Sequence, residues 1–68
     1  MIVTVNGQPR ELPPTATVAS VVELLGAEPG ARGVAVALNG EVVARGRWPE
    51  TALAEGARVE VVSAIQGG

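Results

Sequence analysis

Apolar side chains recur at every second position in three short stretches of the chain, which is the pattern of β-strands with one buried face. The stretches cover residues 2–5, 34–38 and 58–63. An Asn-Gly pair follows each of the first two stretches, and both residue types tolerate the positive φ of a tight turn. The two pairs predict two β-hairpins, whose returning strands cover residues 8–12 and 41–45.

The returning strand of the first hairpin carries polar side chains where an apolar face is needed. A strict two-residue loop places Gln8 and Arg10 on the face of Val5. We therefore expect a bulge or a longer loop that turns Leu12 inward. Pro9 has no N–H group to donate to a further strand, so it marks this strand as an edge of the sheet.

Between the hairpins the apolar spacing changes to that of an α-helix. Thr17 has a hydroxyl group that can cap the first turn, and Gly26 can take the left-handed position after the last turn. We expect a helix over residues 18–25, followed by a loop over residues 26–33. One buried stripe falls at positions i, i+3, i+4 and i+7 of this helix, which are Val18, Val21, Val22 and Leu25.

The alternating pattern stops after the second hairpin, and residues 46–56 predict an irregular link. Trp48 is the only aromatic residue of the chain. In a core otherwise built from small and medium side chains, we expect Trp48 and Leu53 to fill the open end. A contact between Trp48 and a partner is the other interpretation.

This order of elements favours an α+β fold in which one helix packs on one face of a mixed sheet of four to five strands. The first and last strands can lie side by side and parallel at the centre of the sheet. That arrangement is the β-grasp, or ubiquitin-like, fold. We expect residues 1–63 to form this single domain and residues 64–68 to form a flexible tail.

The composition removes most kinds of catalytic site. A chain of 68 residues has room for one small core. It contains no cysteine, histidine, lysine, tyrosine or aspartate, which are the usual nucleophiles, general bases and metal ligands. We therefore expect neither an enzyme nor a metal-binding protein.

Charge and hydropathy limit the partners. Five arginines stand against seven glutamates, for a net charge of −2, and without a basic run or stacking aromatic residues we expect no nucleic-acid partner. The first residues do not resemble a secretory signal. The longest clean apolar run, VAVAL, is far too short to cross a bilayer. We expect a cytoplasmic protein with no membrane partner.

Alternation in the last strand leaves apolar side chains on its outward face. Val62 and Ala64 share this face with Arg58 and Glu60. Single exposed valines are ordinary on protein surfaces and need no functional explanation. The other interpretation is that this face docks a partner, and these four residues are the candidates for it.

The sequence finishes in a glycine pair, Gly67 and Gly68, directly after Ile65 and Gln66. Many chain ends are flexible and have no role. Glycines lack a Cβ atom, however, so such a tail can thread a narrow channel and deliver its carboxylate into the active site of another protein. A carboxylate must be activated before it reacts, most simply as an acyl-adenylate made from ATP. In a chain without cysteine, the Gly68 carbonyl could then carry sulfur as a thiocarboxylate.

Four stretches cover nearly the whole length of the chain, and they are VNGQPRELP (5–13), TVASVVELL (17–25), RGVAVALNGEVVARGRWPETAL (32–53) and EGARVEVVSAIQGG (55–68). Their most specific parts are the Ala-Leu-Asn-Gly-Glu run, the Arg-x-Trp segment and the final Gln-Gly-Gly. In these stretches the sequence resembles the ThiS family of thiamine-biosynthesis sulfur carriers. Ala57 departs from the family, which often has an aspartate there.

The resemblance implies a carrier that is a co-substrate and not an enzyme. It implies that Gly68 is adenylated by a ThiF-like activating enzyme, which uses ATP and Mg, and is then converted to a thiocarboxylate. A sulfur donor such as a cysteine desulfurase system would supply the sulfur, and a ThiG-like thiazole synthase would receive it. The carrier itself is expected to bind no cofactor.

Other functions on the same fold stay open at this point. The small subunit of molybdopterin synthase uses the same Gly-Gly thiocarboxylate, although such carriers tend to be longer, and Trp48 and Gln66 fit the thiamine type better. A protein-conjugating modifier shares the adenylate chemistry. A β-grasp binding module without carrier chemistry would tolerate an extra residue after Gly68, whereas a carrier would not.

Overall fold

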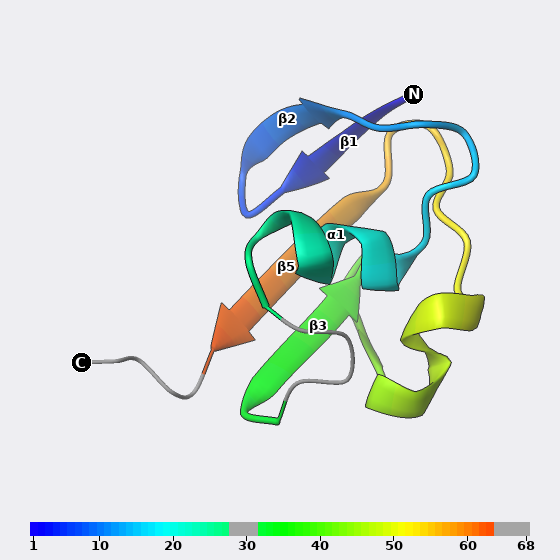
Figure 1. Cartoon of the computed structure of the whole chain (residues 1–68). Helices are drawn as coiled ribbons and strands as arrows, with labels where there is room; N and C mark the ends of the chain where they lie inside the picture. Colours follow the sequence, from blue (N-terminus) through cyan, green and yellow to red (C-terminus); the bar gives the residue numbers. More distant parts are fainter. Residues whose placement is uncertain (28–31, 64–68) are drawn as a thin grey trace.

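Five strands pair into one mixed sheet in the order β2-β1-β5-β3-β4 within the described part of the chain (Figure 1). The computed structural model describes residues 1–27 and 32–63. β1 and β5 run parallel, and every other pair of neighbours is antiparallel. The strands are β1 (Ile2–Val5), β2 (Gln8–Glu11), β3 (Val34–Leu38), β4 (Glu41–Val43) and β5 (Arg58–Ser63).

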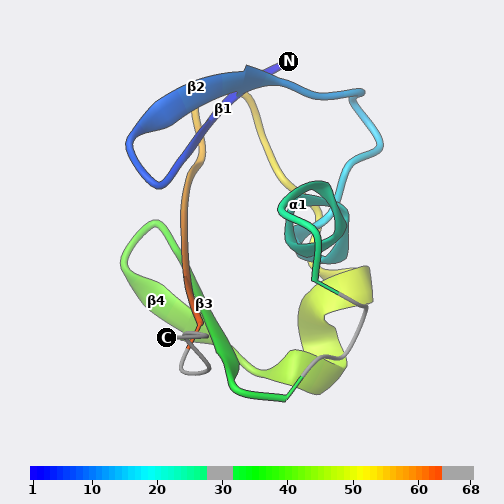
Figure 2. The ribbon, with the colours of Figure 1, turned by 60° about the vertical axis from the view of Figure 1, so that its left-hand side comes forward.

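One helix, α1 (Val18–Leu24), lies across one face of this curved sheet (Figure 2). Strand order, strand direction and the position of the helix are those of the β-grasp fold, which confirms the predicted fold class. β2 lies at the edge of the sheet, as Pro9 predicted. No helix among residues 1–27 and 32–63 has the length and apolar character needed to cross a membrane. The predicted tail, residues 64–68, lies outside the described residues.

Both hairpins turn through an Asn-Gly pair, as predicted. Asn6 and Gly7 have φ angles of 50° and 81°, and Asn39 and Gly40 have φ angles of 51° and 89°. Positive φ at both central positions gives a turn whose twist matches that of the flanking strands. The two turns therefore join their strands without strain.

The prediction of a bulge or a longer loop in the first hairpin was wrong. Val5 pairs directly with Gln8 and no extra residue follows in the β1–β2 register. The amide of Leu12 donates to the carbonyl of Met1 at 2.8 Å, so pairing continues past β2. Leu12 has the same parity as Gln8 and Arg10, and it is buried without any shift of register. The two polar side chains share the inner face, which is tolerated because they lie on an edge strand and reach solvent.

Helix α1 begins at a reciprocal cap. The hydroxyl of Thr17 accepts from the Ser20 amide at 3.4 Å, and the Ser20 hydroxyl accepts from the Thr17 amide at 2.9 Å. The Thr17 amide would otherwise lack a partner at the helix start, and the Ser20 amide also donates to the Thr17 carbonyl at 3.0 Å. The prediction of Thr17 as the N-cap is confirmed. Of the predicted stripe, the three valines are fully buried, and they are Val18, Val21 and Val22.

The prediction that Leu25 is buried was wrong. The helix ends at Leu24 and Leu25 is its C-cap residue, with 39% of its surface exposed. Gly26 follows with a φ angle of 91° and turns the chain away. The seventh position after Val18 therefore lies beyond the helical turn that faces the sheet.

The link after β4 is not irregular as predicted, because residues Arg45–Glu50 form a short 3₁₀ helix, η1. β4 consequently ends at Val43 and not at residue 45. Trp48 is 1% exposed, and its Nε1 donates to the carbonyl of Val43 at 3.0 Å. Leu53 is 7% exposed, so both predicted plugs of the core are confirmed.

Candidate functional site

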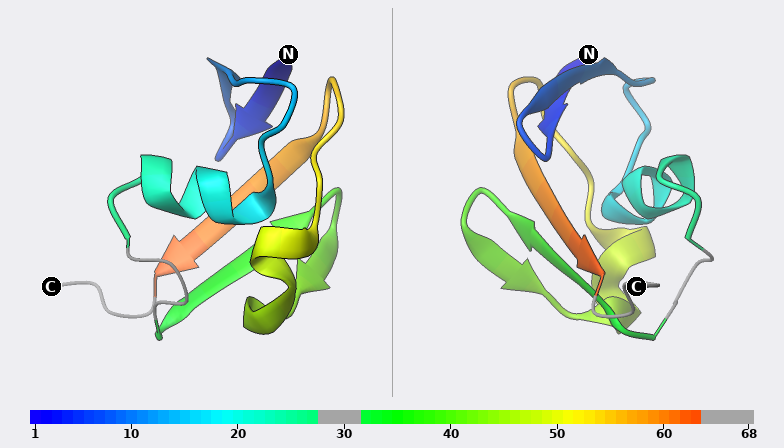
Figure 3. Two further views of the ribbon diagram at one scale, coloured as in Figure 1. Left: turned by 45° about the vertical axis from the view of Figure 1, so that its right-hand side comes forward. Right: turned by 90° about the vertical axis from the view of Figure 1, so that its left-hand side faces the viewer.

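β5 leads to the C-terminal tail, and it lies at the centre of the sheet between β1 and β3 (Figure 3). Val59 is fully buried and Val61 is half-buried on the helix side, whereas Arg58, Glu60 and Val62 are exposed. The predicted alternation of this strand is confirmed. Three of the four docking candidates therefore lie together on the face of the sheet away from α1.

Apolar side chains from three strands gather on this outward face. Ala35 lies opposite Val62, and Ala37 lies between Glu60 on one side and Val42 on the other. Cross-strand partners point to the same face of a sheet. Val62 is 64% exposed and Val42 is 82% exposed. We call this surface the outward patch, and its members are Ala35, Ala37, Val42 and Val62.

Val42 was missed by the sequence analysis, although the signal was present. The Asn39-Gly40 turn brings Val43 opposite Val36 on the buried face. The preceding residue must then point to the other face, because side chains alternate along a strand. Val42 is the most exposed of the large apolar residues that the structure describes, and it adds a second exposed valine to the face that carries Val62.

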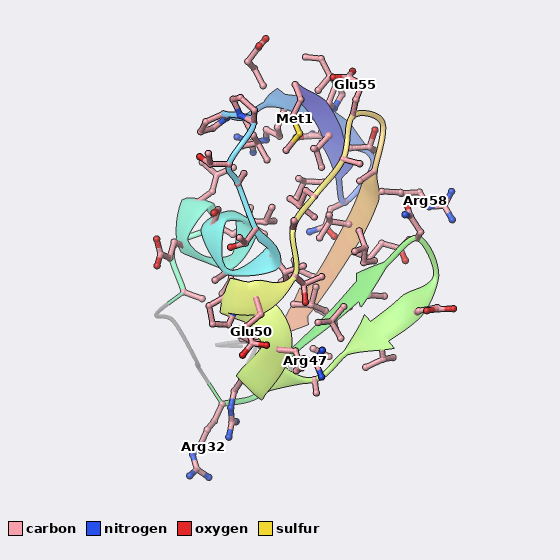
Figure 4. The ribbon with its side chains drawn as sticks, turned by 90° about the vertical axis from the view of Figure 1, so that its right-hand side faces the viewer. Met1, Arg32, Arg47, Glu50, Glu55 and Arg58 are labelled. Atoms are coloured by element: carbon pink, nitrogen blue, oxygen red, sulfur yellow. The ribbon has the colours of Figure 1, made fainter. Side chains whose placement is uncertain are left out.

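Charged side chains border the outward patch on β5. Arg58 projects into solvent at the start of the strand (Figure 4), and Glu60 lies between Arg58 and Val62 on the same face. Among the described residues, ion pairs involve other groups, such as Arg47 with Glu50 at 3.6 Å on η1. The two charges beside the patch are thus available to a partner.

The remaining site predictions fall on residues outside the described part of the chain. They concern the docking candidate Ala64, the residues expected to enter the partner, and Gly68 as the modified residue. The last described residue, Ser63, pairs with Val34 of β3. Pairing with β3 therefore continues up to the residue before the predicted tail. Over residues 1–27 and 32–63 the structure encloses no pocket.

Comparisons with known proteins find the same fold in chains that match over the whole length of this one. A crystal structure of the thiamine biosynthesis protein ThiS from Geobacter metallireducens is 33% identical, with a TM-score of 0.78 and 100% of each chain covered. An NMR solution structure of a thiamine biosynthesis protein from the same organism is 31% identical, with a TM-score of 0.74, covering 100% of this chain and 88% of that one. No curated protein matches the sequence. The ThiS family model matches residues 3–68, and the chain therefore belongs to the ThiS family.

Proposed function

We propose that this chain is a sulfur carrier of thiamine biosynthesis, and that its Gly68 carboxylate is the group that carries the sulfur. The observation that supports this most is the extent of the family match, which includes the final Gln-Gly-Gly as well as the β-grasp sheet. The likeness to ThiS structures above 30% identity supports the same assignment. The individual reaction steps are part of the same proposal.

The chemistry starts from a carboxylate that is unreactive by itself. A ThiF-like activating enzyme binds ATP and Mg, and an oxygen of the Gly68 carboxylate attacks the α-phosphate, with pyrophosphate as the leaving group. Persulfide sulfur from a cysteine desulfurase system then displaces AMP to give an acyl disulfide. A thiol reductant cleaves its S–S bond, so that sulfur replaces one oxygen of the terminal carboxylate. A ThiG-like thiazole synthase receives this sulfur. The carrier is itself a co-substrate, its partners catalyse the reactions, and we place the carrier in the cytoplasm.

We propose that the outward patch docks the activating enzyme. The patch extends over β3, β4 and β5, and β5 is the strand that continues into the tail. A partner seated on it would therefore be close to the residues it must bind next. Arg58 and Glu60 border the patch and would fix the orientation of the complex, because charges at the rim of an interface act mainly on specificity and on the association rate.

Replacing Val62 with glutamate should weaken binding to the activating enzyme at least about tenfold, because the complex would bury an unpaired carboxylate in an apolar contact. The fold should lose about 1 kcal/mol or less, since the side chain is mostly solvent-exposed. Titration calorimetry gives the affinity, and thermal unfolding followed by circular dichroism gives the stability.

Leu24→Glu is a matched control for Val62→Glu. Leu24 is 46% exposed and lies on α1, across the sheet from the outward patch. The same change of side chain at this position should leave the affinity unaltered. Equal affinities for the wild-type chain and Val62→Glu would remove Val62 from the docking surface.

The intact mass of the chain tests the proposed function directly. The wild-type protein is incubated with ATP, magnesium, a sulfur donor and the activating enzyme, and its mass is compared with that of a sample without ATP. We expect a gain that matches exchange of one oxygen for sulfur, located at Gly68 by fragmentation. A folded protein that binds the enzyme and never changes mass would be a binding module and not a carrier.

A further inference from the structure

The side chain of Asn6 continues the pairing between β1 and β5 after β1 has ended. The amide of Thr4 donates to the carbonyl of Ala57, and the amide of Asn6 donates to the carbonyl of Val59, both at 2.9 Å. The next step of this parallel ladder is at Val61. There the Val61 amide donates to Asn6 Oδ1 at 2.8 Å, and Asn6 Nδ2 donates to the Val61 carbonyl at 3.3 Å.

A carboxamide can replace a strand residue because it offers the same donor and acceptor as a peptide group. The backbone of Asn6 cannot supply them itself, since its φ angle of 50° turns the chain into the first hairpin. Asparagine is among the few residue types that accept this left-handed conformation. Asn6 therefore forms the turn and also pairs with the neighbouring strand.

This contact lies close to the point where the tail begins. On its other edge β5 pairs with β3 as far as Ser63, and Val62 lies opposite Ala35. On the β1 edge, the last backbone pair is Val5 with Val59. The Asn6 side chain extends pairing on this edge to Val61, so β5 is held from both sides nearer to the tail than β1 alone would allow.

Asn39 provides an internal comparison at the opposite end of β5. It occupies the same position of the second hairpin turn, with a φ angle of 51°. Its Oδ1 accepts from the Arg58 amide at 2.9 Å, and its own amide donates to the Arg58 carbonyl at 2.8 Å. Each hairpin therefore holds β5 through an asparagine, but only Asn6 does so at the end that leads to the tail.

We propose that the Asn6 carboxamide is a positioning residue for the tail. By fixing both edges of β5 at Val61, it holds the end of the strand from which the activating enzyme takes up the terminal carboxylate. Without it, the Val61 peptide groups on this edge pair with water, and the end of β5 is held only by β3. This role deepens the proposed carrier function and rests on it.

The test compares Asn6→Gly with Asn39→Gly. Both substitutions remove a carboxamide that holds β5, and glycine accepts the positive φ at either position. Steady-state pyrophosphate release by the activating enzyme is measured at a temperature where circular dichroism shows both variants folded. Asn6→Gly should lower kcat roughly fivefold, because β5 loses a net stabilisation of about one hydrogen bond near its end. KM should change little. Asn39→Gly should change neither constant.

KM should be unchanged in Asn6→Gly because β3 supports the outward patch, and Asn6 does not contact the β3 edge of β5. A second measurement needs no partner. Amide hydrogen exchange by NMR should show faster exchange at Val61 in Asn6→Gly, and unchanged exchange there in Asn39→Gly.

The outcomes separate the two proposals. If the wild-type chain is adenylated and both variants have the same kcat, or if Asn6→Gly alters only KM, the positioning role is wrong. Unchanged exchange at Val61 in Asn6→Gly would also overturn it. If the wild-type chain itself releases no pyrophosphate, the proposed function fails, whatever the exchange data show about the contact.

Discussion

Deletion of Gly68 should abolish adenylation and sulfur loading while leaving the unfolding transition unchanged. The deletion moves the terminal carboxylate back by one residue, which is roughly 3.5 Å of extended chain. Misplacing a reacting group by even about 1 Å can cost on the order of a hundredfold in rate. Every core residue described in the structure lies between Val3 and Val59, so the fold does not depend on the deleted residue.

Two measurements check this prediction together. Circular dichroism during heating reports the fold, and intact mass after incubation with ATP, a sulfur donor and the activating enzyme reports the loading. Adding one alanine after Gly68 is the matched variant, because it displaces the carboxylate by a similar distance in the other direction and should be equally inactive. Sulfur on the shortened chain, or a collapsed fold, would contradict the prediction.

Trp48→Ala should remove most of the stability of this protein. Cutting a fully buried tryptophan back to alanine typically costs about 3–5 kcal/mol. A chain of 68 residues has on the order of 3–10 kcal/mol in total. The rest of the described core consists of valine, leucine and alanine, so no neighbouring side chain is large enough to fill the space. Urea unfolding followed by circular dichroism measures the loss.

Trp48→Phe separates packing from hydrogen bonding in that prediction. Phenylalanine retains a ring in the core but cannot donate to the Val43 carbonyl, and an unpaired acceptor costs about 1–3 kcal/mol. Its stability should fall between those of the wild type and the alanine variant. Val42→Ala, at an exposed position, should change stability by about 0.5 kcal/mol or less. A Trp48→Ala variant as stable as the wild type would show that η1 is not part of the cooperative core.

Local signals in the sequence predicted the elements well. The two Asn-Gly pairs and the Thr17 cap act through the backbone of adjacent residues, and all of them lie where they were expected. The errors concern features set by packing at a distance. Leu25 is exposed because the helix stops one residue earlier than the apolar spacing suggested. η1 forms where Trp48 is buried, and the segment alone carries no signal for a 3₁₀ helix.

The same distinction applies to the candidate site. The outward position of Val62 follows from alternation within one strand, and it was predicted. The role of the Asn6 side chain depends on Val61, which is 55 residues away in the sequence, and no local pattern pairs these two residues. The tail was singled out by its glycines, and residues 64–68 stay a prediction.

The central position of β5 has a consequence for the newly synthesised chain. The two hairpins are joined into one sheet only through β5, and this strand is the last of the described elements to leave the ribosome. Until it emerges, each strand of the two hairpins has at most one partner strand, and isolated two-stranded hairpins are marginally stable in water. The outward patch does not exist at that stage, because Val62 belongs to β5. An enzyme that recognises the patch would therefore ignore nascent chains and select those that have finished folding.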